Sequence, residues 1–267
     1  MERFIHIRDD IGIAARVIQR NNTESARFFV EHSIMLFVQK GTKILRWENK
    51  ECVIAEGEGI AIAAGRRYDF INLLSDDGNY DAVWLALDKR IIAAHVCADH
   101  HGQVINDPLP IRDIEPAFRA SFERALEAVA IKDEIPSPVA QHRLSEVLIW
   151  INLHGGCFRP LQSVSVSDRV RSMLSAQPAN NWNALDVACR LAMSEATLRR
   201  RMASEGISFS ELLIDVRMSY ALTLLQSTEL PISRISMDVG YESASRFAAR
   251  FNKRFGFAPR TVRGYER

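Results

Sequence analysis

The chain has 267 residues, of which 47% are hydrophobic and 25% are charged, a composition typical of one or two globular domains. No apolar run is long enough to span a bilayer, and the opening MERFIHIRDD has no signal-peptide core, so we expect a cytoplasmic protein with no membrane partner. The net charge of +1 hides an asymmetry, because residues 161–267 contain 15 Lys and Arg against 10 Asp and Glu. This basic C-terminal third predicts an anionic partner for one end of the chain.

Residues from about 31 to 88 have the pattern of short antiparallel strands. An apolar run covers 32–39, and turn residues follow at 48–50 and 56–59. Two more apolar runs flank Asp77-Gly78-Asn79, which predicts a further hairpin. This spacing predicts a small antiparallel barrel or sandwich.

Two amphipathic helices are predicted after the strands. Apolar residues recur near every fourth position, first from Ile114 to Val129 and then from Val139 to Ile151. Such a pair can pack on its own barrel or form a contact between two copies, and the sequence leaves both open. We expect a homodimer through residues 113–153.

The segment HGGCFRPLQSVSVS, residues 154–167, is rich in glycine and serine and has no periodicity. An N-cap pattern at Ser167-Asp168 then begins a helical region. We therefore predict an N-terminal domain over 1–155, a linker over 156–166 and a C-terminal all-α domain over 167–267.

Two segments of the C-terminal region repeat each other. Ala192 aligns with Gly240, 48 residues later, and after one inserted residue Ser194 aligns with Ser243, 49 residues later. In each copy a short helix ends on the small residue, and the serine caps a second helix with a buried i, i+4 pair. This is the pattern of a helix-turn-helix, whose second helix enters the major groove of DNA.

A helix is predicted between the two copies. Ser208 and Glu211 form a capping box at the start of this helix, and an apolar helical pattern follows it. Pro231 prevents the helix from continuing further. A helix of ~18 residues is about 27 Å long. It can set two recognition helices about one DNA turn, roughly 34 Å, apart.

Residues 167–263 resemble the DNA-binding domain of the AraC/XylS family of bacterial transcription regulators. The matching residues are Val187, Ala188, Met193, Ser194, Leu198, Arg200, Gly206, Phe209, Arg217, Ala221, Leu224, Leu225, Ile232, Ile235, Gly240, Tyr241, Ser243, Ser245, Phe247, Phe251, Gly256 and Pro259. The resemblance implies an α+β protein, with a small cupin-like antiparallel β-barrel and two helices followed by two helix-turn-helix subdomains joined by a long helix. It further implies an activator of transcription that binds double-stranded DNA and RNA polymerase, and an N-terminal domain that binds an effector, dimerises or does both.

The resemblance also assigns DNA contacts. The residues that reach bases are Ala196, Arg199, Arg200, Ser245 and Ala249. Those expected at the backbone are Ser194, Thr197, Ser243, Arg246, Arg250, Lys253 and Arg254. Arginine can bind guanine through two hydrogen bonds or pair with phosphate, although Arg199 and Arg200 could instead be solvated or paired with Glu195. The family usually has arginine where this chain has Ala249, so we expect the second helix to contact mostly phosphates.

The N-terminal domain gives weaker signals. Trp47, Phe70 and Trp84 are candidates for a small-molecule pocket, or they form part of the barrel core. The stretch 57–72 has no histidine, so we expect neither a catalytic metal nor another cofactor. The cluster HVCADHH, with His95, Cys97, His100 and His101, could bind zinc or be a plain loop; we assign it no metal.

Two other classes of function remain as alternatives. An enzyme with an appended DNA-binding module is not favoured, because the sequence lacks G-x-S-x-G, H-E-x-x-H and G-x-x-x-x-G-K-[ST], and we assign no catalytic residue. A regulatory protein controlled by another protein in place of a small molecule is compatible with DNA binding.

Overall fold

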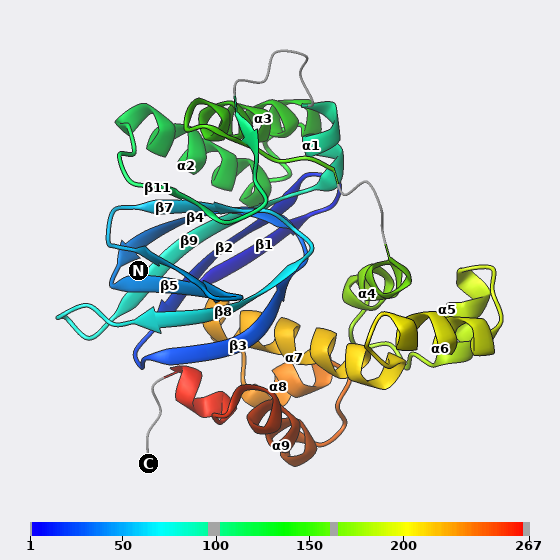
Figure 1. Ribbon diagram of the computed structural model, residues 1–267. Helices are drawn as coiled ribbons and strands as arrows, with labels where there is room; N and C mark the ends of the chain where they lie inside the picture. Colours follow the sequence, from blue (N-terminus) through cyan, green and yellow to red (C-terminus); the bar gives the residue numbers. More distant parts are fainter. Residues whose placement is uncertain (1, 96–101, 161–164, 264–267) are drawn as a thin grey trace. The chain divides into compact units, whose positions relative to one another are not determined.

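The computed structural model describes residues 2–95, 102–160 and 165–263. The chain divides into two compact units, one built mainly from residues up to 161 and one built mainly from the residues after it. We call these the N-terminal domain and the C-terminal domain (Figure 1).

The N-terminal domain contains two large antiparallel sheets and a short parallel pair of strands. The six-stranded sheet has the order β1 (Phe4–Arg8), β2 (Gly12–Gln19), β9 (Tyr80–Leu87), β4 (Ser33–Lys40), β7 (Gly59–Ile62) and β11 (Leu109–Ile111). The four-stranded sheet has the order β3 (Thr23–Val30), β8 (Arg66–Leu73), β5 (Thr42–Trp47) and β6 (Lys50–Ile54). The parallel pair joins β10 (Gln103–Val104) to β12 (Gly156–Cys157).

The central strands of the six-stranded sheet are buried on both faces, which explains the continuous apolar run SIMLFVQK of β4. Side chains alternate along a strand. Met35 and Phe37 therefore join one buried cluster, while Leu36 and Val38 join another. The second cluster fills the space between the two sheets, where Leu45 of the four-stranded sheet also lies. A strand with two buried faces is apolar at nearly every position.

Helices cover the first of these faces. They are α1 (Lys89–Ala94), α2 (Pro116–Ala130) and α3 (Ser137–Leu153). Phe37 of the sheet contacts Phe118 and Phe122 of α2, with ring centroids 5.4 and 4.4 Å apart, and Leu144 of α3 lies in the same cluster. The predicted amphipathic pair thus packs on its own sheet, and the homodimer stays a prediction.

The strands differ from the prediction in two ways. The sheets begin well before residue 31, with β1, β2 and β3. The turn at 77–79 is present, but the strands on its two sides, β8 and β9, belong to different sheets and do not pair, so the predicted hairpin is wrong. Turn residues reverse the chain locally, whereas pairing depends on the distant strands β2, β4 and β5, which the turn sequence does not reveal.

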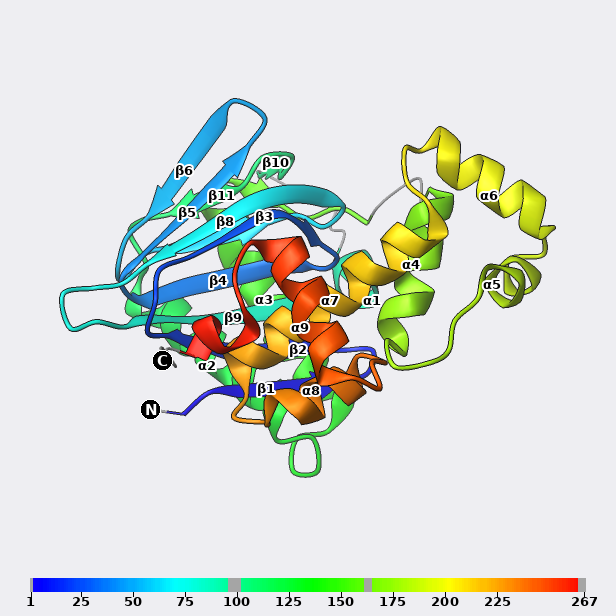
Figure 2. The same ribbon diagram turned by 90° about the horizontal axis from the view of Figure 1, so that it is seen from below.

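The C-terminal domain is helical. Its helices are α4 (Val166–Ala176), α5 (Ala184–Arg190), α6 (Glu195–Ser204), α7 (Phe209–Ser227), α8 (Ile232–Asp238) and α9 (Ala244–Phe255), followed by the 3-10 helix Pro259–Arg263. The long α7 lies between the α5–α6 pair and the α8–α9 pair (Figures 1 and 2). The α+β fold class predicted from the sequence is confirmed.

The start of α4 differs from the predicted N-cap. Ser165, not Ser167, caps the helix, because its hydroxyl accepts a hydrogen bond from the Asp168 amide at 3.0 Å and its own amide donates to the Asp168 carboxylate at 3.2 Å. Strand β12 and the first residue of α4 both fall inside the segment predicted as a linker. The domain boundaries themselves stay a prediction.

Candidate DNA-binding interface

The internal repeat is visible in the backbone hydrogen bonds of the two turns. The Met193 amide donates to the carbonyl of Ala188 at 3.0 Å, and 48 residues later the Tyr241 amide donates to Ser236 at 2.8 Å. The Ala192 amide donates to Cys189 just as the Gly240 amide donates to Met237, at 3.0 and 2.9 Å. The two helix-turn-helix units, α5–α6 and α8–α9, therefore share one backbone design.

Both turns place their small residue in the left-handed region. Gly240 has φ of 78° and Ala192 has φ of 54°. Glycine adopts this conformation without strain, whereas alanine is strained there. At Gly240 a second constraint applies, since an added Cβ would lie 2.6 Å from Nη2 of Arg217.

The two serines cap the recognition helices as predicted. Ser194 Oγ accepts a hydrogen bond from the Thr197 amide at 3.2 Å, and Ser243 Oγ accepts one from the Arg246 amide at 3.3 Å. A capped helix N-terminus retains free amides and the positive end of the helix dipole, both of which favour a phosphate.

Helix α6 separates a buried face from an exposed one. Leu198 and Met202 are fully buried. The predicted base-contacting residues Ala196, Arg199 and Arg200 are all exposed. The guanidinium of Arg199 pairs with Glu195 at 2.6 and 2.8 Å, so it must leave or share that carboxylate to bind a base. Arg200 has no ion-pair partner among the described residues.

Helix α9 is the more cationic of the two. Phe247 and Phe251 are buried, while Ser245 and Ala249, the predicted base-contacting positions, are exposed. A recess of about 670 Å³ runs along the outer face of the turn and the helix. Its lining residues are Gly240, Tyr241, Glu242, Ser243, Arg246, Ala249, Arg250 and Lys253. Within the described part of the chain, the three cations of this recess have no ion-pair partner, which leaves their charges available to an anion.

Arg254, predicted to contact the DNA backbone, makes an ion pair within the domain. Its side chain is 18% exposed, and its Nε and Nη2 both lie 2.9 Å from Oδ1 of Asp215 on α7. Arg171 of α4 binds the other oxygen of the same carboxylate at 2.8 Å. Arg254 is therefore held inside the domain by an ion pair that spacing along α9 could not show.

The aromatic residues proposed for a small-molecule pocket pack against the cluster between the two sheets. Trp47, Phe70 and Trp84 are each partly buried there. Trp47 Nε1 also donates a hydrogen bond to Asp107 at 3.0 Å. This packing agrees with the core alternative, and a pocket at these residues stays a prediction.

The candidate zinc cluster falls largely outside the described residues. Cys97, His100 and His101 lie there, and His95 is the one member that the structure describes. Over residues 2–95, 102–160 and 165–263, no group of three or more His, Cys, Asp or Glu side chains is placed to hold a metal ion. In those same ranges no helix is both long and apolar enough to cross a membrane.

A buried polar cluster, which the sequence did not reveal, lies between the two sheets. Lys43 of β5 is buried and donates a hydrogen bond to Asn72 Oδ1 at 2.9 Å. Asn72 in turn donates to Gln19 Oε1 at 3.0 Å. Lys43 Nζ lies 4.5 Å from the centroid of the Phe70 ring and 5.8 Å from that of Tyr80. Burial lowers the pKa of Lys43 to about 7. An inward-pointing lysine in a strand looks like any surface lysine in the sequence.

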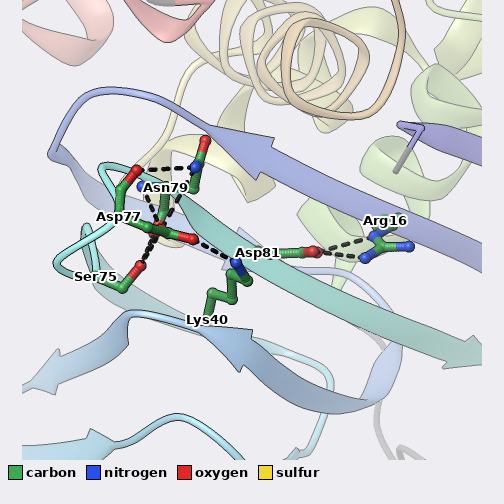
Figure 3. Close-up of polar contacts among 6 residues, drawn as sticks. All are labelled: Arg16, Lys40, Ser75, Asp77, Asn79 and Asp81. Atoms are coloured by element: carbon green, nitrogen blue, oxygen red, sulfur yellow. Dashed lines mark hydrogen bonds and ion pairs between the residues drawn. The ribbon is translucent and has the colours of Figure 1, made fainter.

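The other lysine at this end of the domain is paired. Lys40 donates to Asp77, whose carboxylate also accepts a hydrogen bond from Ser75 Oγ at 2.6 Å (Figure 3). Nearby, Asp81 accepts two hydrogen bonds from Arg16 at 2.9 and 2.6 Å. Each cation drawn there thus has a carboxylate partner. Lys43 has none within ion-pair distance among the described residues.

The geometry of the C-terminal domain defines a class of protein. Two turns with the same hydrogen bonds each lead into a serine-capped helix, and each helix buries one face and exposes a polar or cationic one. A helix of 19 residues, α7, joins the two units. This is a double helix-turn-helix arrangement, the class of domain in which the second helix of each unit typically enters the major groove of DNA.

Comparison with known proteins agrees with this class. A family model described as "Helix-turn-helix domain" matches residues 187–265. The transcriptional regulator YdeO of Escherichia coli is 33% identical over 128 residues, which cover 45% of this chain and 50% of YdeO. The virulence regulon activator VirF of Shigella flexneri is 33% identical over 37% of each chain, and the activator CfaD of Escherichia coli is 38% identical over 38% of each. The chain thus spans half or less of the length of these relatives, and its C-terminal domain matches a helix-turn-helix domain and resembles those of the AraC/XylS family, as the sequence predicted.

Solved structures of ToxT from Vibrio cholerae resemble the chain over nearly its whole length. An apo variant of ToxT gives a TM-score of 0.65 at 14% identity, covering 96% of this chain and 97% of ToxT. ToxT with a bound unsaturated fatty acid gives the same TM-score at 15% identity, covering 98% and 100%. At this identity the likeness shows a shared fold and nothing more.

Proposed function

We propose that the protein is a sequence-specific DNA-binding regulator of transcription. The observation that carries the proposal is the recess along α9, which begins at the serine-capped N-terminus and is lined by Arg246, Arg250 and Lys253, none with an ion-pair partner among the described residues. The same serine cap recurs on α6, so the domain has two capped second helices that can meet one duplex. The relatives YdeO, VirF and CfaD, named as transcriptional regulators, support the same function.

The two recognition helices are assigned different work. Arg200 on α6 is exposed and free to bind a base edge, where an arginine discriminates guanine. The exposed positions of α9 that would face bases, Ser245 and Ala249, are short, and its long cations lie beside them. We therefore assign base recognition mainly to α6 and phosphate binding mainly to α9.

The test is selection of DNA sites from a random pool with the full-length protein at physiological salt. We expect a motif with one strongly specified half-site, bound by α6, and a weakly specified region about one helical turn away. A pool that shows no enrichment over several rounds would contradict the proposal. Two equally specified half-sites would keep the function but overturn the division of work between the helices.

Further partners belong to the proposal as well. An activator must contact RNA polymerase, and the two-fold symmetry of many operators favours a homodimer. A transcription regulator works beside the chromosome, so the proposed location is the cytoplasm. We assign the protein no enzymatic activity, because every role named above is one of binding.

A second candidate function concerns the N-terminal domain, which we propose binds a small acidic molecule. A buried lysine without a carboxylate partner is costly, and a ligand anion would offset that cost. The Tyr80 hydroxyl and Gln19 Nε2 are also buried, and neither has a hydrogen-bond partner among the described residues. The fatty acid named with ToxT is a carboxylic acid, which supports the same ligand class.

A matched ligand series tests this second function. The melting temperature is measured with monocarboxylic acids of increasing chain length and with the primary alcohols of the same lengths. We expect acids to stabilise the protein and alcohols not to, and we expect Lys43→Met to remove the effect. Lys40→Met, which changes a partly exposed lysine paired with Asp77, is the control and should respond like the wild type. Equal stabilisation by acids and alcohols would contradict a role for Lys43, and no stabilisation by any compound would favour control by a protein partner.

A further inference from the structure

The carboxylate of Asp215 joins three helices of the C-terminal domain. Arg171 of α4 donates to one of its oxygens at 2.8 Å, and Arg254 of α9 donates to the other through Nε and Nη2, both at 2.9 Å. The three side chains are 6%, 11% and 18% exposed, for Arg171, Asp215 and Arg254 respectively. Such charge-assisted hydrogen bonds are directional, and burial protects them from screening by salt.

The two arginines connect Asp215 to different parts of the domain. Val170 and Leu174 of α4 are buried in the same cluster as Leu198 and Met202 of α6, so α4 packs with the first helix-turn-helix unit. Arg254 lies on α9, the recognition helix of the second unit. One carboxylate therefore connects the core beneath α6 to α9 itself.

Arg217 makes a second connection from the same helix. Its Nε donates to the carbonyl of Pro178 at 3.0 Å, and its Nη2 donates to Asn180 at 2.9 Å, in the loop before α5. Its guanidinium also lies 5.7 Å from the centroid of the Tyr241 ring, in the turn before α9. The close approach of Gly240 to the same guanidinium, described above, completes this contact.

We propose that Asp215 and Arg217 are positioning residues that fix the separation and angle of the two recognition helices before DNA is bound. A helix of 19 residues such as α7 can bend and twist. Two side-chain connections between the units it joins restrict those motions. The duplex that this rigid pair accepts is one whose two half-sites lie at a single spacing, so these buried residues set operator spacing without contacting DNA. The DNA consequence rests on the proposed function, whereas the restriction of the helices does not.

The variants must break the connection without leaving an unpaired buried charge. Removal of Asp215 would leave two arginines uncompensated and could unfold the domain. Arg171→Met and Arg254→Met each leave Asp215 paired with one arginine, and methionine retains the length of the apolar stem. The control is Arg234→Met on α8, which breaks an exposed ion pair with Asp238 that joins no other element.

The first measurement needs no DNA. Spin labels are attached through genetically encoded ketone side chains at the exposed positions Arg201 on α6 and Asn252 on α9, and the distribution of distances between them is recorded in the full-length protein. We expect one narrow distribution for the wild type and for Arg234→Met. Arg171→Met and Arg254→Met should both broaden it, and by similar amounts.

The second measurement uses the DNA site selected from the random pool, with one or two base pairs inserted between its two parts. Because α9 specifies its part of the site only weakly, we expect the wild type to lose about threefold in affinity per altered spacing, and both methionine variants to lose clearly less. The slope of log affinity against log salt should stay unchanged for both variants, because neither removes a phosphate contact.

The outcomes separate the explanations. If Arg254→Met alone weakens binding at every spacing and lowers the salt slope by about one, while Arg171→Met behaves like the wild type, Arg254 contacts phosphate and the inference is wrong. If the wild type selects no DNA, the proposed function fails and the spin-label distances decide the inference on their own. Unchanged distances in both variants would overturn it.

Discussion

The two helix-turn-helix units have the same backbone conformation in their turns but present different side chains. Three backbone hydrogen bonds of the turn repeat at an offset of 48 residues, among them those from Leu191 to Val187 and from Val239 to Ile235, both at 3.1 Å. On α6, Arg199 forms an ion pair with Glu195, whereas the recess of α9 is lined by three cations without ion-pair partners among the described residues. The proposed function assigns base recognition to the first of these surfaces and phosphate binding to the second.

The largest expected effect comes from the turn of the second unit. Gly240→Val should destabilise the C-terminal domain by about 3 kcal/mol or more, because a β-branched residue is strained at positive φ and its Cβ would collide with Arg217. Thermal and denaturant unfolding measure this. A wild-type melting curve for the variant would show that the turn is not constrained as described.

Arg200→Ala tests base recognition by the first unit. We expect a loss of roughly 1–3 kcal/mol in binding to the selected site, with relaxed selectivity at one base pair. Binding to every single-base variant of the site is measured for both proteins. Selectivity that is unchanged at all positions would remove Arg200 from the base-contacting set. Arg201→Ala, one residue further along α6 and equally exposed, is the matched control.

Arg250→Ala tests phosphate binding by the second unit. The variant should bind all sequences more weakly by a similar factor, and its salt slope should fall by about one, because one fewer counterion is released. Titrations at several salt concentrations, on specific and non-specific duplexes, measure both quantities. A loss confined to a single sequence would mean that α9 contacts bases after all.

The smallest expected effect comes from the turn of the first unit. Ala192→Gly should stabilise the domain by about 0.5–1 kcal/mol, because glycine relieves the strain of a left-handed alanine. The free energy of unfolding in denaturant measures it. The opposite signs expected at Ala192 and Gly240 would show that both turns require the same backbone conformation.

The stability of the N-terminal domain is predicted to depend on pH through Lys43, which has no counterpart in the two helix-turn-helix units. Since burial lowers the pKa of Lys43 to about 7, the unfolded chain, with its ordinary lysine pKa near ~10.4, binds more protons than the folded one between these values. Stability should therefore rise with pH above about 7, by at most ~1.4 kcal/mol per unit, and Lys43→Met should flatten this rise. Unfolding free energies at pH 7 and pH 9 check the sign. A steeper rise in the variant would contradict the assignment.

Features written in short stretches of sequence could be predicted. Ser194, Ser243 and the Ser208–Glu211 capping box each act within a few residues, and the structure places all of them as expected. The buried pairs of α6 and α9 follow from helical periodicity in the same way. The repeat supports the prediction of both helix-turn-helix units, because a chance match to the pattern is much rarer in two copies than in one.

Features that depend on distant partners could not be predicted. Arg254 is one of several arginines along α9, and its partner Asp215 lies 39 residues earlier. Lys43 points into the space between two sheets, and that direction depends on pairing with Asn72, 29 residues away. The turn at 77–79 was visible, but which sheets its strands join was not. In each case the missing information is a tertiary contact.

Strand β4 has a mechanical consequence for the N-terminal domain. Its neighbouring residues alternate between the helix-covered core and the core between the sheets, so one backbone segment belongs to both. Close-packed interiors yield little volume and pass displacement on to their neighbours. Any molecule that enters between the sheets and pushes on Leu36 or Val38 would shift Met35 and Phe37 on the other side, and Phe37 contacts α2 directly. Strand β4 thus links the core between the sheets to the helices that cover the other face.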